Sequence, residues 1–543
     1  MNLNNNTKGA LQSAKADYVS SLKKKKKVSR KTRHKNNAKE QFDAKSFLGA
    51  PLASDWKPSK GWFAVFVLCY VLMQVAISLG SYSGFNDPPK FGDFEAQRHW
   101  QEITTELPLT EWYANSSAND LSYWGLDYPP LSAYHSYVVG KVSNMVNPEW
   151  TALYTSRGIT DDHHKLFMRL SVIITSVAFY MPALWMLLGS NKPSTFVAAA
   201  FYPGLMLIDN GHFQYNHIAL GFFLWAVYFF SNNRFLIGSV SFVLAVNFKQ
   251  MELYHSLPIF VFLLSRCAKR KIFKGFVDLV CIGSVVIATF AVLWVPFIWS
   301  NGGVLQVLKR VFPFERGVFE DKVASFWMVY GIAVRLFFRF TGDTSFTGYE
   351  VFDALFSEKD PMKAASAFMV LAFLAPSLYK LFKQPTVRHL KYSLCISSLV
   401  FFLFSYHVHE KSILFAAVPC LLILDEHFLP VAAFLAVTNM SLYPLLLRDG
   451  VEVALPMIIF SFGAVICYSR AHAMPIKSMS LLLGILGVGI CLTQLLCVPP
   501  SALPDLFPVV NSTFSFVMFI LTLMYLNYVL LVNPLTENHA GNK

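Results

Sequence analysis

Charged residues are scarce in this chain of 543 residues: Asp, Glu, Lys and Arg make up 15% of it, against 54% hydrophobic residues. Soluble domains carry roughly 25% charged residues. Apolar runs follow one another from residue 61 to residue 532 without the polar linkers that separate soluble domains. This composition argues against a soluble enzyme and favours a polytopic membrane protein, because a bilayer accommodates so much apolar surface.

Metal-binding and disulfide patterns are also missing. The eight cysteines lie almost entirely in or beside apolar runs and form no CxxC pair, so we expect buried free thiols. His212 and His217 are too far apart to share a helix face well, and the sequence has no HExxH pattern. We therefore expect no zinc site.

The positive charge is concentrated near the N-terminus. Residues 1–60 hold fifteen Lys or Arg against four Asp or Glu, a net +11 of the chain's +13. The lysine run at 23–27 could be a nuclear address or an RNA-binding arm. Its position ahead of a hydrophobic segment favours a disordered cytosolic tail that orients the first helix. It lacks a cleavage-site pattern and is not a secretory signal peptide, and no nucleic-acid partner is expected.

Fourteen apolar stretches are candidate membrane-spanning helices of an all-α protein. The segment 323–340 is apolar enough to be another, but counting it would move the basic loop at 380–391 to the lumen. We therefore predict one long lumenal loop that contains a membrane-embedded or interfacial helix. The candidate spans lie near residues 61–80, 166–188, 195–208, 217–231, 235–248, 251–265, 276–298, 363–380, 392–406, 411–424, 428–446, 452–468, 478–497 and 514–532.

The loops between these stretches support one orientation. With a cytosolic N-terminus, the Lys- and Arg-rich loops are all cytosolic, as the positive-inside rule requires. The sequons at Asn115 and Asn511 fall on the lumenal side, where glycosylation occurs, and the sequon at Asn439 falls inside a span. The predicted organisation is a cytosolic tail at 1–60, a catalytic membrane module at 61–410 with large lumenal loops at 81–165 and 299–362, C-terminal helices at 411–532 and a short cytosolic tail at 533–543.

Polar residues gather in four places on the predicted lumenal side. They lie in the two large loops, at residues 209–216 and at residues 406–411. Ionisable groups at membrane depth cost at least about 2.5–3.5 kcal/mol each, so they tend to pair or to line a site. For His409 to Lys411 a solvated turn between two helices is the alternative.

Two aspartates in the first large loop each have a catalytic and a structural interpretation. Asp93 could cap the helix that begins near Phe94, and Asp127 could set the turn before two prolines. The aromatic residues around them suit either an interfacial belt or stacking on a sugar ring. Spacing alone does not decide between these roles.

Six motifs resemble those of the dolichyl-phosphate-glucose-dependent glucosyltransferases, membrane enzymes of the GT-C fold in N-glycan assembly. The run at 92–97 and Gly211 are most like the members that add the first glucose; the sibling that adds the second is the alternative. Asn210 is a departure, because the family often has His there. The motifs are GDFEAQRHW (92–100), YWGLDYPPL (123–131), GHFQYN (211–216), FKQM (248–251), FEDKVASFW (319–327) and HVHEK (407–411).

The resemblance implies an inverting transfer of glucose from dolichyl-phosphate-glucose, in α-1,3 linkage, to a dolichyl-diphosphate-linked oligosaccharide. It implies an endoplasmic reticulum membrane enzyme with a lumenal active site. Asp93 corresponds to the general base, and Asp127 would be a supporting carboxylate. A single displacement needs one carboxylate to take the acceptor proton, and the departing phosphate needs cations and hydrogen-bond donors. The candidates for binding the donor phosphate and the sugars are Arg316, Lys322, His409, Lys411, His407, Glu95, Arg98, His212 and Gln214.

No metal and no other cofactor is expected, because side-chain cations can hold a monophosphate. The alternative from another class is a transporter or lipid scramblase, which would also be apolar throughout with polar residues at depth. Such proteins usually show inverted repeats and broken helices near the midplane. The sequence shows no internal repeat and its polar clusters lie at one membrane face, which favours an enzyme. A non-catalytic assembly subunit is a third possibility.

Overall fold

The computed structural model of the chain describes residues 60–189, 192–312, 322–341 and 359–532. All regular secondary structure in these residues is helical, so the predicted all-α class is confirmed. The predicted tails, apart from Lys60, lie outside the described residues, and so does Arg316.

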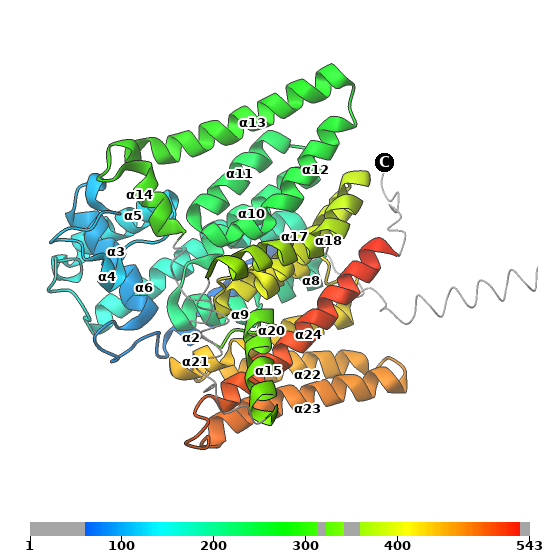
Figure 1. The fold of residues 1–543 in the computed structure, drawn as a ribbon. Helices are drawn as coiled ribbons and strands as arrows, with labels where there is room; N and C mark the ends of the chain where they lie inside the picture. Colours follow the sequence, from blue (N-terminus) through cyan, green and yellow to red (C-terminus); the bar gives the residue numbers. More distant parts are fainter. Residues whose placement is uncertain (1–59, 190–191, 313–321, 342–358, 533–543) are drawn as a thin grey trace, which may run out of the picture.

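The body of the protein is a bundle of long apolar helices (Figure 1). Eight helical segments in the described ranges are long and apolar enough to cross a membrane. They are α2 (Lys60–Ser78), α6 (Asp162–Thr175) continued by η3 (Ser176–Tyr180), α7 (Met181–Leu184) and η4 (Trp185–Gly189), α13 (Ile272–Trp294) with η7 (Val295–Trp299), α17 (Lys359–Lys383), α18 (Val387–Phe404), α20 (Phe428–Ser441) with α21 (Tyr443–Arg448), α23 (Met474–Leu496) and α24 (Leu506–Leu531).

Shorter helices complete the bundle. Thirteen of the fourteen predicted stretches each coincide with one long or short helical segment, and the stretch at 195–208 covers two. Because several are short, the number of crossings stays a prediction, as do the GT-C assignment and the division at residue 410. The shorter segments are α8 (Pro193–Ala200), α9 (Pro203–Met206) with η5 (Leu207–Phe213), α10 (Asn216–Ser231), α11 (Phe235–Phe248), η6 (Gln250–His255) with α12 (Ser256–Ala268), η8 (Glu410–Ile413) with α19 (Leu414–Leu421), and α22 (Ala454–Ser469).

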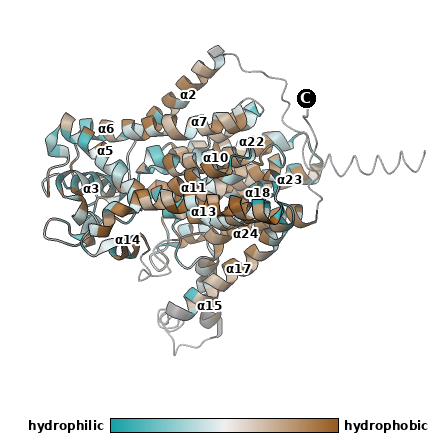
Figure 2. Cartoon of the chain, turned by 90° about the horizontal axis from the view of Figure 1, so that it is seen from above, coloured by the Kyte–Doolittle hydropathy of each residue, from teal (hydrophilic) through white to brown (hydrophobic). Residues whose placement is uncertain are grey.

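The helices of the first large loop gather at one end of the bundle (Figure 1), and Figure 2 shows that this end is more hydrophilic than the body. Two of these helices, the one that contains Gln101 and the one that contains Gly140, pack closely together. A Cβ at Gly140 would lie 2.8 Å from the Gln101 carbonyl oxygen, so glycine permits this close packing. The helices at this end are α3 (Gly92–Glu106), α4 (Leu121–Trp124), α5 (Pro130–Val146) and α14 (Gly303–Val311).

Aromatic side chains pack the start of α3 against η5. The Phe94 ring stacks on Tyr82 with centroids 4.1 Å apart and contacts Phe213 at 4.7 Å. Gly92 begins α3 with a φ of 64°, and a Cβ there would lie 2.6 Å from the Ser83 carbonyl carbon. Glycine is the residue that adopts this conformation without strain, so the backbone is free to turn and place residue 93 beside η5.

The predicted glycosylation at Asn511 is wrong. Helix α24 begins at Leu506, earlier than the predicted residue 514, so Asn511 lies inside the helix. Its side chain is fully buried and its amide donates a hydrogen bond of 3.0 Å to the Met440 carbonyl oxygen. Asn115, in contrast, is exposed.

The apolar segment predicted at 323–340 forms α15 (Phe326–Thr341). It packs against α18 and α24, two of the helices long enough to span. An interfacial or embedded position for α15 stays a prediction.

Candidate active site

The Asp93 carboxylate lies where three parts of the chain meet. Its Oδ2 is 2.5 Å from Lys411 Nζ in η8 and 3.0 Å from His212 Nε2 in η5. It also accepts a hydrogen bond from Gln214 Nε2, just after η5. Asp93 sits inside the first turn of α3, after Phe91 in the cap position. Its side chain therefore does not cap the helix, which was the structural interpretation of Asp93 from sequence. It faces these three partners instead.

These contacts keep Asp93 ionised. Burial acts to raise the pKa of the Asp93 carboxyl, but Lys411 and His212 outweigh it and hold the pKa well below its usual value. Burial likewise disfavours the Lys411 ammonium, and the nearby Asp93 carboxylate raises the pKa of Lys411 above its ordinary value. The pair is thus charged at neutral pH, and Asp93 has a lone pair available to accept a proton.

The carboxylate opens into a cavity of about 970 Å³, the size of a pocket for a drug-sized ligand. Its lining combines two kinds of side chain. Polar and aromatic residues are Gln97, Trp100, Trp124, Asp127, Tyr128, Gln250, His407, His409 and Arg448. The wall from α17 and α18 adds the apolar Ala367, Val370, Leu371 and Phe401 beside Lys363 and Ser366. Such a cavity fits an amphipathic ligand.

A second buried lysine, Lys249, lies in the same cavity. Its Nζ is 2.6 Å from the Asn216 Oδ1 and 3.3 Å from the Gln214 Oε1, and it lies over the Tyr128 ring at 5.0 Å. Burial, with repulsion from Lys411, lowers the pKa of Lys249 to about 8, so most of it is protonated at neutral pH. Its residue type and position suit it to bind an anion.

The structure brings together most of the candidates predicted from sequence. His212, Gln214 and Lys411 contact Asp93 directly. The remaining members of this group line the cavity, with the two histidine rings 5.0 Å apart. They are Asp127, His407 and His409.

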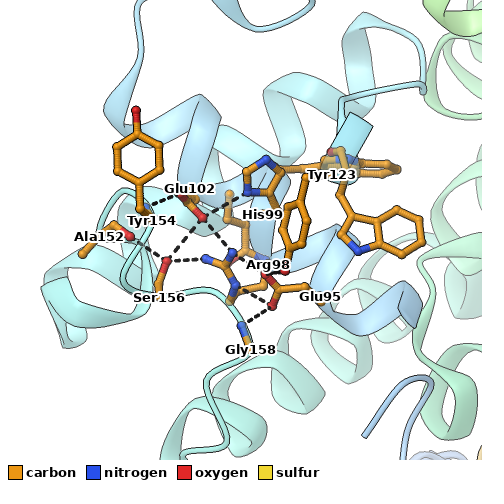
Figure 3. Close-up of polar contacts among 12 residues, drawn as sticks. Glu95, Arg98, His99, Glu102, Tyr123, Ala152, Tyr154, Ser156 and Gly158 are labelled. Atoms are coloured by element: carbon orange, nitrogen blue, oxygen red, sulfur yellow. Dashed lines mark hydrogen bonds and ion pairs between the residues drawn. The ribbon is translucent and has the colours of Figure 1, made fainter. Parts of the chain in front are cut away.

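Glu95 and Arg98, predicted to bind substrate, face away from the cavity. Residues 93, 96, 97 and 100 of α3 line the cavity, and positions three or four apart share a helix face. Arg98 lies on another face, has no exposed surface and bonds to both oxygens of Glu95 and to Glu102 (Figure 3). These residues hold the loop at 152–158 against α3, through Ser156 among others.

Lys322 is also apart from the cavity. Its Nζ lies 2.8 Å from Asp505 Oδ2 in a half-exposed pair near the start of α24. Arg316 lies outside the described residues.

Two functional candidates were missed from sequence. Lys249 lies in the FKQM motif, one of the six that carry the family resemblance, but the sequence analysis assigned no role to this lysine. Asp449 follows α21 and bonds to His212 with an Nδ1 to Oδ2 distance of 2.5 Å. Its sequence context, Arg-Asp-Gly after an apolar run, is the ordinary pattern of a helix end. No local sequence feature therefore identified Asp449 as a functional candidate.

In the described ranges, no group of three or more His, Cys, Asp or Glu side chains is arranged to hold a metal ion. The absence of a metal requirement stays a prediction about the reaction.

Together the fold and the site define a membrane protein with an ionised carboxylate at the polar end of an amphipathic cavity, the layout of an enzyme that acts on a lipid-linked substrate. Comparison with known proteins is consistent with this class. Residues 65–525 match the ALG6, ALG8 glycosyltransferase family, and the chain belongs to that family. It is therefore a glycosyltransferase, which sets aside the transporter and assembly-subunit interpretations.

Relatives from animals cover nearly the whole chain. A protein from Caenorhabditis elegans named "Probable dolichyl pyrophosphate Man9GlcNAc2 alpha-1,3-glucosyltransferase" is 43% identical over 85% of this chain and 88% of its own length. Proteins from Gallus gallus and Mus musculus, both named "Dolichyl pyrophosphate Man9GlcNAc2 alpha-1,3-glucosyltransferase", are 40% identical over 86% and 87% of this chain, and over 96% of their own lengths.

Proposed function

We propose that this protein transfers glucose from dolichyl-phosphate-glucose to the terminal mannose of a dolichyl-diphosphate-linked oligosaccharide, in α-1,3 linkage and with inversion. The reaction takes place at the lumenal face of the endoplasmic reticulum membrane. The observation that carries the proposal is the Asp93 carboxylate, held ionised at the polar end of the amphipathic cavity. The names of the relatives support α-1,3-glucosyl transfer to a Man9GlcNAc2 acceptor.

The chemistry is a single displacement. The acceptor hydroxyl oxygen attacks C1 of glucose as the bond from C1 to the phosphate oxygen breaks, and Asp93 takes the hydroxyl proton. One carboxylate is sufficient, because no glycosyl-enzyme intermediate forms and the phosphate leaves without protonation. The contacts of Asp93 with His212, Gln214 and Lys411 all go to Oδ2, so Oδ1 is the atom we assign to the acceptor hydroxyl.

The cavity's cations bind the donor phosphate and offset the charge on the departing dolichyl phosphate. Lys411, Lys249 and His409 line the same cavity as the apolar side chains of α17 and α18. Preorganised positive charge in a low-dielectric site stabilises charge that develops in the transition state. The apolar end of the cavity would take the first isoprene units of the donor, and Asp127 and the aromatic wall would take the acceptor sugar.

Acceptor choice distinguishes this proposal from addition of the second glucose. With purified protein and dolichyl-phosphate-glucose, we expect the unglucosylated Man9GlcNAc2 lipid to gain one hexose at least about tenfold faster than the same lipid already carrying one glucose. Mass spectrometry of the released glycan measures the product, and the Asp93→Asn protein serves as the blank. Faster reaction of the monoglucosylated lipid would assign the chain to the second step.

Transfer should not need a divalent cation, since lysine ammonium groups at the cavity can hold a monophosphate. We expect initial rates in EDTA to equal those in buffer with magnesium or manganese, within the error of the assay. A rate that collapses in chelator and recovers on addition of manganese would refute this part of the proposal.

A further inference from the structure

Asp449 is a buried carboxylate that takes no direct part in the proposed displacement. It follows α21, outside the six motifs, and its side chain is 3% exposed. It does not line the cavity. Its Oδ2 lies 2.5 Å from His212 Nδ1, on the side of the ring opposite to Asp93. The imidazole therefore lies between two carboxylates, one of which is the proposed base.

The charge balance of this cluster favours a protonated ring. Among Asp93, Asp449, Lys411 and His212, a neutral imidazole leaves a net charge of −1, whereas imidazolium leaves none, and buried charges are usually paired. In imidazolium both ring nitrogens are donors, which matches a carboxylate at 2.5 Å and at 3.0 Å. A neutral ring would point one lone pair at a carboxylate.

Other charged groups are packed around η5. Lys411 Nζ is 3.1 Å from His212 Nε2 and opposes the positive ring. From α6, Arg169 donates to the Gly211 carbonyl oxygen. Within η5, Asp209 bonds to His217, and Arg448 of α21 lines the same cavity as His212. Burial and Lys411 act to lower the pKa of His212, but Asp93 and Asp449 outweigh them and raise it above its ordinary value.

We propose that Asp449 is a positioning residue for glucosyl transfer, which keeps His212 protonated and oriented so that its Nε2–H donates to Asp93 Oδ2. This rests on the proposed role of Asp93 as base. The bond fixes the carboxylate rotamer and reserves Oδ1 for the acceptor hydroxyl. An aspartate that orients a catalytic histidine from its far nitrogen is established chemistry in hydrolases; here the histidine serves a carboxylate base.

The test is Asp449→Asn in the full-length purified protein, with dolichyl-phosphate-glucose and the Man9GlcNAc2 lipid as substrates. Loss of one charge-assisted hydrogen bond should lower kcat by about tenfold to a hundredfold, with KM for both substrates unchanged. The alkaline limb of the pH profile should move to lower pH, because His212 loses its proton more easily without Asp449. The matched control is Glu452→Gln, an exposed acid three residues further along, which should behave as the wild type.

His212→Gln provides a second test, and its pH profile does not depend on how well Asp449→Asn folds. A glutamine amide donates to Asp93 without needing a charge, so the alkaline limb should disappear. Adding Asp449→Asn to it should change kcat by less than about twofold, as for uncoupled sites. A His212→Gln profile that keeps the wild-type alkaline limb, or an Asp449→Asn cost that is equally large in both backgrounds, would overturn the inference.

The outcome is separable from that of the proposed function. Loss of transfer in Asp93→Asn together with wild-type kinetics in Asp449→Asn would refute only the positioning role. Full activity in Asp93→Asn would refute the base assignment and, with it, the reason for Asp449 to matter.

Discussion

Replacing Asp93 with asparagine should lower the rate of glucosyl transfer by about two to four orders of magnitude, the usual contribution of a positioned general base. Asparagine has the same shape and keeps an oxygen for Lys411, but its oxygen cannot take the acceptor proton. Donor binding should persist, because the cations that hold the phosphate remain. Initial rates at saturating donor and acceptor, with a donor-binding measurement, separate the two effects.

The pH profile of the wild type bears on the same residue. Because the pKa of Asp93 is held well below its usual value, the base stays ionised as pH falls, and loss of activity near pH 4 should not come from Asp93. The matched control is Asp87→Asn, an exposed aspartate in the same loop, which should transfer glucose at the wild-type rate. Near-normal turnover in Asp93→Asn with a normal elution profile would show that another group is the base.

The second large effect is on stability. Arg98→Met should lower the free energy of unfolding by about 3–5 kcal/mol, because it leaves Glu95 and Glu102 buried without their shared cation. The arginine lies 2.6 Å from one Glu95 oxygen and 2.7 Å from Glu102, with no exposed surface on Arg98 or Glu102. The melting midpoint of the purified protein measures the loss. Arg270→Met breaks an exposed pair with Asp278 and should cost under about 1 kcal/mol.

The same network makes a pH prediction with a definite sign. Burial acts to raise the pKa of Glu102, but bonds from His99 and Arg98 outweigh it and lower the pKa from 4.5 to about 2. A lowered carboxyl pKa contributes stability that is complete above the unfolded value. The contribution should therefore be full above about pH 4.5 and fall away as the pH approaches 2. An Arg98→Met protein as stable as the wild type at neutral pH would contradict the structural role.

The residues in contact with Asp93 could be found from sequence because each lies in a motif of consecutive polar residues, which apolar flanks make conspicuous. His212, Gln214 and Lys411 are of this kind. The motif around Asp93 was a poorer guide, because a helix distributes adjacent residues over different faces. Asp93 and Gln97 share the cavity face while Arg98 turns away from it, and only the packing of α3 on its neighbours decides which face is which.

Asp449 and Asn511 show a second limit of prediction from sequence. Both lie in the C-terminal part of the chain, where the motifs are absent and a boundary error of a few residues changes the conclusion. Asn511 was predicted in a loop but lies in a buried part of a helix, because α24 starts earlier than its apolar run suggested. The role of Asp449 depends on a contact across 237 residues of sequence, which no local pattern encodes.

That long separation has a consequence for biosynthesis. The four groups of this cluster are translated in the order Asp93, His212, Lys411 and Asp449, so Asp449 leaves the ribosome 237 residues after its partner His212. At typical elongation rates this is on the order of ten to fifty seconds. A nascent chain released before residue 449 would contain all six motifs and most of its helices. It would still lack the carboxylate that bonds to His212 Nδ1. Completion of the charge cluster around Asp93 is thus coupled to synthesis of the C-terminal part of the chain.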